Sequence, residues 1–254
     1  MEGGGWNFVV NFVVNFVDQV DDKEKGSALH PPPSTFPQPI DMNQKPDYSL
    51  YLVTDELLAG SRGVEAAVHA AVAGGVTVVQ LREKQTTGRA FLERACALGE
   101  WLRGRGVTFI VNDRIDIALA CGADGVHVGQ EDLPCRVARR LMGPDRIVGV
   151  SVSTVAEALQ AEADGADYLG VSPVFSTLTK TDTPEPTGLA GLTAIRAAVR
   201  LPLVAIGGIH VGNARQVLAA GADGIAVVSA ILTAPDPCVA ARELRGVCGR
   251  IAGR

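Results

Sequence analysis

The sequence predicts an α/β protein, a single (β/α)8 TIM barrel with a non-barrel N-terminal extension, and three observations lead to this prediction. From Tyr48 onward, short β-rich runs alternate with Ala-rich stretches of helical apolar spacing. Eight such strand–helix pairs fit into roughly 200 residues, a length at which this barrel commonly forms one domain. A phrase that begins Gly-Ala-Asp recurs ahead of three of the expected strands, which indicates repeated βα units. A doubly wound parallel sheet is the alternative fold.

The expected strands are short apolar runs, and the expected helices are the Ala-rich stretches between them. We expect strands at 49–53, 77–81, 108–112, 125–128, 147–151, 168–171, 203–206 and 224–228. Helical apolar spacing is clear over 63–73, 91–103, 155–162 and 190–199. In each Gly-Ala-Asp phrase, at 122–124, 165–167 and 221–223, the Gly can end a helix and a short turn leads into the next strand. We therefore interpret these phrases as scaffold rather than chemistry.

Composition supports a large aliphatic core and argues against several classes of protein. Hydrophobic residues make up 47% of the 254-residue chain and aromatic residues only 5%, so the core consists mainly of Ala, Val, Leu and Ile. Twenty-three basic against 28 acidic residues give a net charge of −5, which argues against a general nucleic-acid surface and makes any phosphate site local. The five cysteines form no CxxC pair, which argues against a disulfide framework or zinc site and favours a cytoplasmic protein.

Residues 1–47 differ in composition from the rest of the chain. They include NFVVNFVVNFV, a four-residue repeat that is too short and too Asn-rich for a membrane span and lacks the layout of a signal peptide. A Pro-rich linker follows, which predicts an extended or disordered segment. We expect the barrel to occupy 48–254 and residues 1–41 to lie outside the functional fold, with Met42 as an alternative start. A docking or targeting arm is the rival interpretation.

Three polar side chains stand at alternate positions at the end of the second expected strand: Gln80, Arg82 and Lys84. If the extended period of two continues, they share one side of the chain and converge at the strand's C-terminal end. Arg and Lys at that place suit an anionic ligand, and a phosphorylated one in particular. An ordinary solvated strand end is the alternative interpretation.

Acidic residues follow the third and fourth expected strands. Asp113 comes directly after Asn112, and Asp132 lies in the segment after the fourth strand. In a barrel of this kind, the C-terminal ends of the strands meet at one face. Two carboxylates there would suit Mg²⁺, which typically takes one or two protein carboxylates and completes its shell with water and phosphate oxygens. Alternatively, Asp113 caps the next short helix, and Asp132 opens the helix after the fourth strand, ahead of Pro134.

Later strand ends carry further residues suited to phosphate. Ser151 ends the fifth strand, and Lys180 lies in a long loop over 172–187 whose length suits a lid or binding loop. Helix capping by Ser151 and solvation of Lys180 are the plain alternatives. Loops after the seventh and eighth strands commonly bind phosphate through backbone N–H groups, and here they contain Gly207-Gly208 and Val228-Ser229. One mouth thus offers two anion sites, which favours two phosphorylated substrates.

Taken in order, these segments resemble the thiamine-phosphate synthase family. The similarity runs from about residue 50 to residue 232 and is carried by YLVTD, GGVTVVQLREK, VNDR, GVHVGQEDLP, VGVSVST, SPVFSTLTK and VAIGGI. The ordered set is specific, whereas the Gly-rich phrases alone are weak. The resemblance implies an Mg²⁺-dependent transferase of thiamine biosynthesis. Such an enzyme joins 4-amino-5-hydroxymethyl-2-methylpyrimidine diphosphate to 4-methyl-5-(2-phosphoethyl)thiazole, or to a carboxylated form of it, and releases pyrophosphate.

The resemblance also implies roles for individual residues. It assigns the pyrimidine and its diphosphate to Gln80, Arg82, Lys84, Asn112, Ser151 and Lys180, of which Arg82, Lys84, Ser151 and Lys180 act in catalysis. It assigns Mg²⁺ to Asp113 and Asp132. It assigns the thiazole phosphate to Thr177, Thr179, Gly208, Val228 and Ser229. Two residues of the loop after the sixth strand depart from the family pattern, Ser172 in place of Gly and Ser176 in place of Pro.

The implied chemistry explains why no nucleophile–base pair is apparent. Departure of pyrophosphate leaves a cation on the electron-rich aminopyrimidine, and the thiazole nitrogen captures it without a general base. His127, inside the fourth strand, either supports a site residue or is an ordinary core histidine. Two other functions stay open: a thiazole tautomerase, which would not need the carboxylates and lysines, and a non-catalytic barrel that binds phosphorylated ligands. We expect small-molecule partners, no nucleic acid and no membrane, and we leave the oligomeric state open, a homo-oligomer included.

Overall fold

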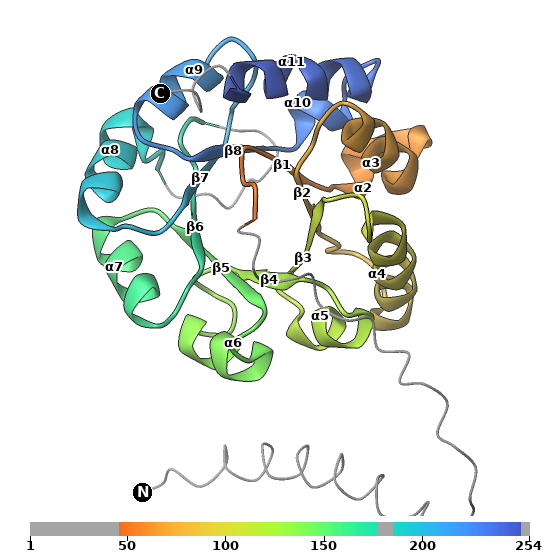
Figure 1. The fold of residues 1–254 in the computed structure, drawn as a ribbon, viewed down its shortest axis with the longest axis horizontal. Helices are drawn as coiled ribbons and strands as arrows, with labels where there is room; N and C mark the ends of the chain where they lie inside the picture. Colours follow the sequence, from red (N-terminus) through yellow and green to blue (C-terminus); the bar gives the residue numbers. More distant parts are fainter. Residues whose placement is uncertain (1–45, 177–184, 250–254) are drawn as a thin grey trace, which may run out of the picture. The chain divides into compact units, whose positions relative to one another are not determined.

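The structure is a closed barrel of eight parallel strands with helices around its outside (Figure 1). The computed structural model describes residues 46–176 and 185–249. Each strand pairs with the next one in the sequence and the last pairs with the first, so the sheet has no free edge. The predicted (β/α)8 fold is confirmed, and the doubly wound sheet is ruled out. The expectation for the N-terminal extension falls almost wholly outside the described residues and stays a prediction.

The eight strands coincide with the predicted ones to within one residue at either end. They are β1 (Leu50–Val53), β2 (Val78–Leu81), β3 (Thr108–Asn112), β4 (Gly125–Val128), β5 (Ile147–Val152), β6 (Tyr168–Val171), β7 (Leu203–Ile206) and β8 (Gly224–Val227). Every strand residue except Ser151 and Ile206 is buried, and both of these line the cavity at the strand ends. Burial on both faces is what a parallel sheet covered by helices requires.

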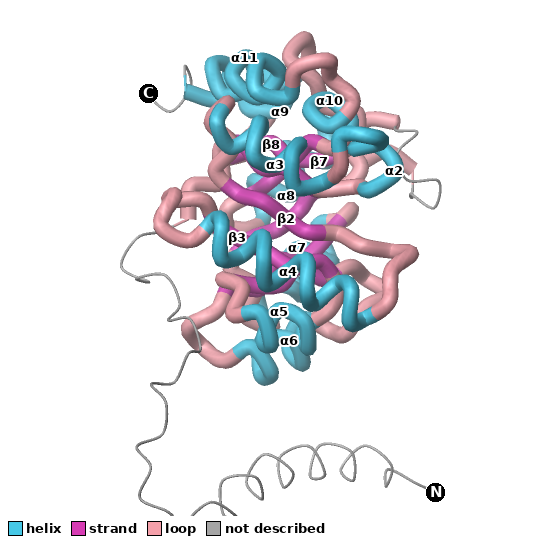
Figure 2. The backbone as a smooth tube through the Cα atoms, turned by 90° about the vertical axis from the view of Figure 1, so that its right-hand side faces the viewer, coloured by secondary structure: helices cyan, strands magenta, loops and turns pink. Residues whose placement is uncertain are grey.

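The helices lie outside the strands (Figure 2), and the four stretches predicted by range are all helical. They are α2 (Glu56–Ala59), α3 (Val64–Ala73), α4 (Gly88–Leu102), α5 (Ile115–Cys121), α6 (Cys135–Met142), α7 (Val155–Ala163), α8 (Gly188–Ala198), α9 (Ala214–Ala219), α10 (Ser229–Leu232) and α11 (Pro237–Gly249), with a 3-10 turn at Gly60–Arg62. Helix α4 begins earlier than predicted because Thr87 caps it, accepting a hydrogen bond from Ala90 N–H. Within the described ranges, no helix is long and apolar enough to cross a membrane.

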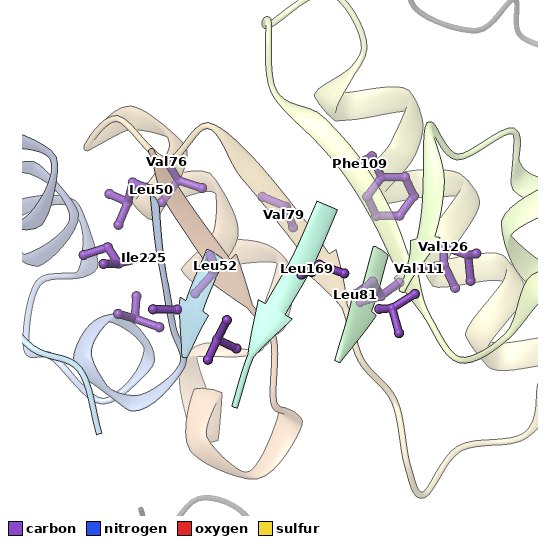
Figure 3. Close-up of a cluster of buried hydrophobic side chains, with 14 of the residues drawn as sticks. Leu50, Leu52, Val76, Val79, Leu81, Phe109, Val111, Val126, Leu169 and Ile225 are labelled. Atoms are coloured by element: carbon purple, nitrogen blue, oxygen red, sulfur yellow. The ribbon is translucent and has the colours of Figure 1, made fainter. Parts of the chain in front are cut away.

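Strand side chains alternate between two cores, one outside the barrel and one within it. Outward-facing residues such as Leu52, Val79 and Leu81 pack in the larger core beneath the helices (Figure 3). The inner cluster is smaller and contains the tyrosines Tyr48, Tyr51 and Tyr168, of which the last two are almost completely buried. The interior of the barrel therefore holds hydroxyl groups among aliphatic residues.

Glycines make room for these large side chains inside the barrel. A Cβ added to Gly149 would lie 2.2 Å from Tyr168 Cζ, far inside contact distance. A Cβ added to Gly170 would likewise lie 2.9 Å from His127 Cε1. These strand glycines mark places where another side chain approaches the backbone closely.

Four strands begin with a reciprocal contact that we call a clasp. A residue just before the strand donates its backbone N–H to a carbonyl of the preceding strand, and its side-chain oxygen accepts the N–H of that same partner residue. The clasps join Asp124 to Phe109, Asp167 to Val148, Asp223 to Leu203 and Thr77 to Leu50, with N···O distances of 2.7–3.2 Å. Three of the four use the Asp of a Gly-Ala-Asp phrase, so these phrases serve as scaffold.

We expect Asp223→Ala to lower the free energy of unfolding by about 1–3 kcal/mol, because it leaves the buried N–H of Leu203 without its acceptor. Urea denaturation followed by circular dichroism measures the change. Asp145→Ala, at an exposed position, is the matched control and should change stability by less than about 0.5 kcal/mol. Equal stability of Asp223→Ala and the parent would contradict the stabilising role of the clasp.

Candidate active site at the C-terminal ends of the strands

A cavity of about 370 Å³ opens at the C-terminal ends of the strands, where residues of all eight strands or of their following loops contribute to its wall. The predicted site residues that line it are Gln80, Arg82, Asn112, Ser151, Gly208, Val228 and Ser229. Lys84, Asp113 and Asp132 do not line the cavity and form a second group, in which Asp113 directly follows the lining residue Asn112. Thr177, Thr179 and Lys180 lie outside the described residues.

The alternation expected at the end of β2 is present for Gln80 and Arg82. Gln80 and Arg82 line the cavity, whereas Leu81 lies in the core beneath the helices. The Glu83 side chain is 1% exposed and pairs with Arg94 of α4. Lys84, the third residue of the predicted set, does not line the cavity, and its side chain is half exposed. Gln80 and Arg82 therefore face the site, whereas Leu81 and Glu83 serve the scaffold.

Two residues that the sequence analysis did not single out hold Arg82 in place. Asp55 Oδ2 lies 3.2 Å from Arg82 Nη1, and Asp55 Oδ1 accepts a hydrogen bond from Leu58 N–H as the N-cap of α2. Thr54 Oγ1 accepts a hydrogen bond from Arg82 N–H at 2.9 Å. Their position directly after a predicted strand was the available signal, because strand ends form the mouth of such a barrel.

The side chains of Lys84, Asp113 and Asp132 form a cluster beside the cavity. Lys84 Nζ lies 2.6 Å from Asp113 Oδ2. Partial burial raises the pKa of Asp132, and the neighbouring Asp113 carboxylate raises it further, although the Gly129 N–H at 2.8 Å and Lys84 act in the opposite direction. Two adjacent carboxylates of which one has a raised pKa would be stabilised by a cation between them.

Asp113 also has an unusual backbone. Among the described residues it is the one non-glycine with a positive φ, 60°, in the left-handed region. Aspartate tolerates this region better than most residues do. Its N–H donates to the carbonyl of His127 at 2.8 Å, which joins the ends of β3 and β4. Backbone strain of this kind is often found at functional sites.

The helix-cap alternatives for the two carboxylates do not hold. The N-cap of α5 is Arg114, without a side-chain cap, so Asp113 does not cap that helix. Asp132 accepts from Gly129 N–H and closes a turn, while the N-cap of α6 is Pro134. Neither carboxylate is therefore accounted for by a helix start.

The opposite part of the wall is built from the ends of β7 and β8. Gly208 has φ of 63°, and a Cβ there would lie 2.9 Å from Phe175 Cβ and 2.8 Å from Ser176 O. Asn213 Nδ2 donates to the Gly208 carbonyl at 2.9 Å and orders this loop. Ser229 is the first residue of α10, and its N–H has no acceptor within that helix. The close approach of the loops at Gly208 leaves no room for a side chain at that position of the wall.

His127 combines the two roles that the sequence left open. It is buried, as a core histidine would be, and it also contacts a site residue, with Nε2 lying 2.9 Å from Ser151 Oγ. Its Nδ1 lies 2.8 Å from Tyr168 Oη. Burial raises the pKa of Tyr168 and of Tyr51, so both phenols stay protonated at neutral pH. The two tyrosines were missed in the sequence because each lies within an apolar strand.

Comparison with known proteins places this site in a family. The family model for thiamine monophosphate synthase matches residues 50–231. The chain is 59% identical over 196 residues to the thiamine-phosphate synthase of Albidiferax ferrireducens, covering 77% of this chain and 90% of that protein. The chain belongs to the thiamine monophosphate synthase family. The thiamine-phosphate synthase of Moorella thermoacetica is 54% identical over 209 residues, covering 82% of this chain and all of that protein.

Solved structures agree with membership of the thiamine monophosphate synthase family. The thiamine phosphate pyrophosphorylase of Pyrococcus furiosus has a TM-score of 0.75 and 42% identity, covering 81% of this chain and 98% of that one. A 3-hexulose-6-phosphate synthase at 21% identity, with a TM-score of 0.62, shares the fold alone. The protein is therefore an enzyme of thiamine biosynthesis and a transferase, as the resemblance implied.

The raised pKa of Asp132 predicts a pH-dependent effect on stability. Because the pKa is higher in the folded state, the contribution of this group is complete at low pH and is lost as the pH rises through the raised value. Asp132→Asn should therefore unfold at a slightly higher temperature than the parent at pH 7 in EDTA, since Asn still accepts from Gly129. The gain should be small because the side chain is largely exposed.

Thermal unfolding at pH 7 and at pH 3 measures this difference, which should disappear at the lower pH because Asp132 is then neutral in the parent as well. Asp145→Asn is the control for removing an exposed carboxylate elsewhere on the barrel. A lower unfolding temperature for Asp132→Asn at pH 7 would show that its charge is not disfavoured in the folded protein.

Proposed function

We propose that this enzyme condenses 4-amino-5-hydroxymethyl-2-methylpyrimidine diphosphate with 4-methyl-5-(2-phosphoethyl)thiazole, or its carboxylated form, to give thiamine phosphate and pyrophosphate. The observation that carries the proposal is one cavity lined both by Arg82, after β2, and by the loops after β7 and β8, which are two kinds of group suited to anions. Lys84, Asp113 and Asp132 form a separate cluster at the ends of neighbouring strands. Family membership makes thiamine phosphate the product to test first.

The pyrimidine diphosphate would bind at the ends of β2, β3 and β5. Gln80 and Asn112 offer amide groups to the ring, because both line the cavity with less than one tenth of their surface exposed. Arg82, fixed by Asp55, would pair with diphosphate oxygens through its planar fork of N–H donors. Ser151 and Lys84 would complete the diphosphate contacts.

Asp113 and Asp132 fit a divalent cation of the Mg²⁺ type. Both offer hard oxygen donors, they lie close enough for one to raise the pKa of the other, and Mg²⁺ rarely needs more than two protein carboxylates. Among the described residues no group of three or more His, Cys, Asp or Glu could hold a metal, so diphosphate oxygens and water would complete the shell. Bound there, Mg²⁺ would neutralise charge on the diphosphate.

The proposed step is a substitution in which bond breaking leads. The C–O bond between the pyrimidine methylene and the diphosphate breaks, and its electron pair leaves with pyrophosphate. Arg82 and Lys84 stabilise the charge that develops on the leaving oxygen. The thiazole nitrogen then donates its lone pair to the methylene cation, forming the C–N bond of thiamine phosphate. No proton has to be removed from that nitrogen, so the site needs no general base.

The thiazole phosphate would bind on the opposite side of the cavity. Gly208, Val228 and Ser229 line it there, and Ser229, the first residue of α10, has an N–H without an acceptor in that helix, which a phosphate oxygen could accept. This arrangement would hold the phosphate so that the ring faces the pyrimidine methylene. Thr177 and Thr179, assigned to the same phosphate by the resemblance, stay predictions.

Pyrophosphate release by the purified protein tests the proposal. We expect release that needs both substrates and Mg²⁺, matched by an equal amount of thiamine phosphate detected by chromatography. Release without the thiazole, or with EDTA present, would argue against the proposed reaction. Binding of thiazole phosphate without any release would instead favour a non-catalytic barrel or a tautomerase.

Asp113→Asn tests the cation site separately. Asn accepts the left-handed backbone of position 113, so the fold should be kept while a carboxylate is lost. We expect kcat/KM to fall roughly a hundredfold or more, and the Mg²⁺ concentration for half-maximal rate to rise. Asp116→Asn is the matched control, because that nearby carboxylate pairs with Arg114 on the exposed face. An Asp113→Asn enzyme with the parental rate would remove Asp113 from the site.

A further inference from the structure

Five polar side chains form one hydrogen-bonded chain along the floor of the cavity, from β2 to β5. Gln80 Nε2 donates to Tyr51 Oη at 2.7 Å, and Tyr51 Oη lies 2.8 Å from Tyr168 Oη. Tyr168 Oη lies 2.8 Å from His127 Nδ1, and His127 Nε2 lies 2.9 Å from Ser151 Oγ. Both tyrosines are 1% exposed, and the ends of the chain, Gln80 and Ser151, face the cavity. The hydrogen-bonded chain therefore connects two residues, Gln80 and Ser151, that each face the cavity at a different place.

Because each group has so few protons, all hydrogen bonds of the chain must run in the same direction. Each tyrosine hydroxyl has a single proton, and a neutral imidazole has one N–H and one accepting nitrogen. When Gln80 donates to Tyr51, the Tyr51 proton goes to Tyr168 and the Tyr168 proton goes to His127 Nδ1. His127 then carries its own proton on Nε2 and donates it to Ser151. A break in this order would leave a buried hydroxyl proton without an acceptor, which is unfavourable.

Two directions satisfy every group, and they present opposite groups to the cavity. In the direction that begins with the Gln80 amide as donor, Gln80 offers its carbonyl oxygen and Ser151 offers its O–H to a ligand. In the reverse direction Gln80 offers its NH2, while Ser151 donates to His127 and can only accept from a ligand. What one end accepts thus fixes what the other end donates.

We propose that this chain is a proton-ordered relay through which Gln80 and Ser151 recognise one ligand jointly, with Tyr168 and His127 as positioning residues. The inference rests on the proposed synthase function and deepens it. The aminopyrimidine donates through its amino group, and its diphosphate accepts, so only the first direction fits both. A ring with an oxo group in place of the amino group would demand the reverse direction and would lose the Ser151 donor as well.

The tautomer of His127 reports the direction of the relay without turnover. We expect long-range ¹H–¹⁵N NMR of protein labelled with ¹⁵N-histidine to show the Nε2–H tautomer when Mg²⁺ and the pyrimidine diphosphate are present without the thiazole. The spectrum of His127→Asn identifies the His127 signals. An Nδ1–H tautomer, or a doubly protonated ring, in this complex would overturn the proposal.

The relay also predicts that Gln80 and Ser151 act together through the tyrosines. Gln80→Leu and Ser151→Ala should each lower kcat/KM for the pyrimidine diphosphate, and their combined effect should differ from the product of the two by roughly threefold or more. Tyr168→Phe removes the central oxygen, so in that background the effects should multiply to within about twofold. No coupling in the parent, or equal coupling in both backgrounds, would overturn the relay.

Tyr48→Phe is the matched control for these cycles. The Tyr48 ring packs on Tyr168 with centroids 4.7 Å apart, but its hydroxyl is not part of the chain, so the coupling should be unchanged. If Tyr168→Phe does not fold, His127→Asn is used in its place, because it breaks the hydrogen-bonded chain before Ser151. A parent enzyme that makes thiamine phosphate without coupling refutes the relay alone. A parent that makes none refutes the proposed function and the relay with it.

Discussion

The clasps at the starts of β2, β4, β6 and β8 are the contacts on which the rest of the molecule depends. Each fixes one residue against a partner in the preceding strand by two hydrogen bonds in opposite directions, and so sets the register of that pair. In a strand, a shift of one residue moves every side chain to the other face. Such a shift in β2 would place Leu81 in the cavity and bury Gln80 beneath the helices. The strand register therefore determines which side chains line the cavity.

Inside that frame, small residues decide where polar groups can lie. Gly149 and Gly170 leave the volume that Tyr168 and His127 occupy, and any side chain at either glycine would collide with them. A hydrogen-bonded chain in an otherwise aliphatic interior is stable only when all of its members are satisfied. The hydrogen-bonded chain thus carries polar groups to the floor of the cavity while each of its members has a partner in the chain.

The sequence predicted the strands well because each is a short apolar run bounded by turn residues, and closure of the barrel then follows from their number. It also predicted that Asp113 and Asp132 approach each other, since strand ends meet at one face. It did not predict the partners of Tyr51 and Tyr168, which stand 117 residues apart and look like ordinary apolar strand positions. Nor did it identify Asp55 as the partner of Arg82, because a helix N-cap explains an aspartate there equally well. Which side chains meet across different strands depends on the strand register, and this register cannot be read directly from a single sequence.

The glycines after β7 bear on how this enzyme could be redesigned. A Cβ at Gly207 would lie 2.7 Å from Pro173 Cβ, and the N–H groups of Val174 and Phe175 donate to carbonyls at the end of β7 and at Gly207. Residues 172–176 after β6 and the glycines after β7 are consequently held together. Under the proposed function, a variant that accepts a bulkier thiazole would have to change these two segments together. Thr233 and the start of α10 also line the cavity and offer another place to gain space.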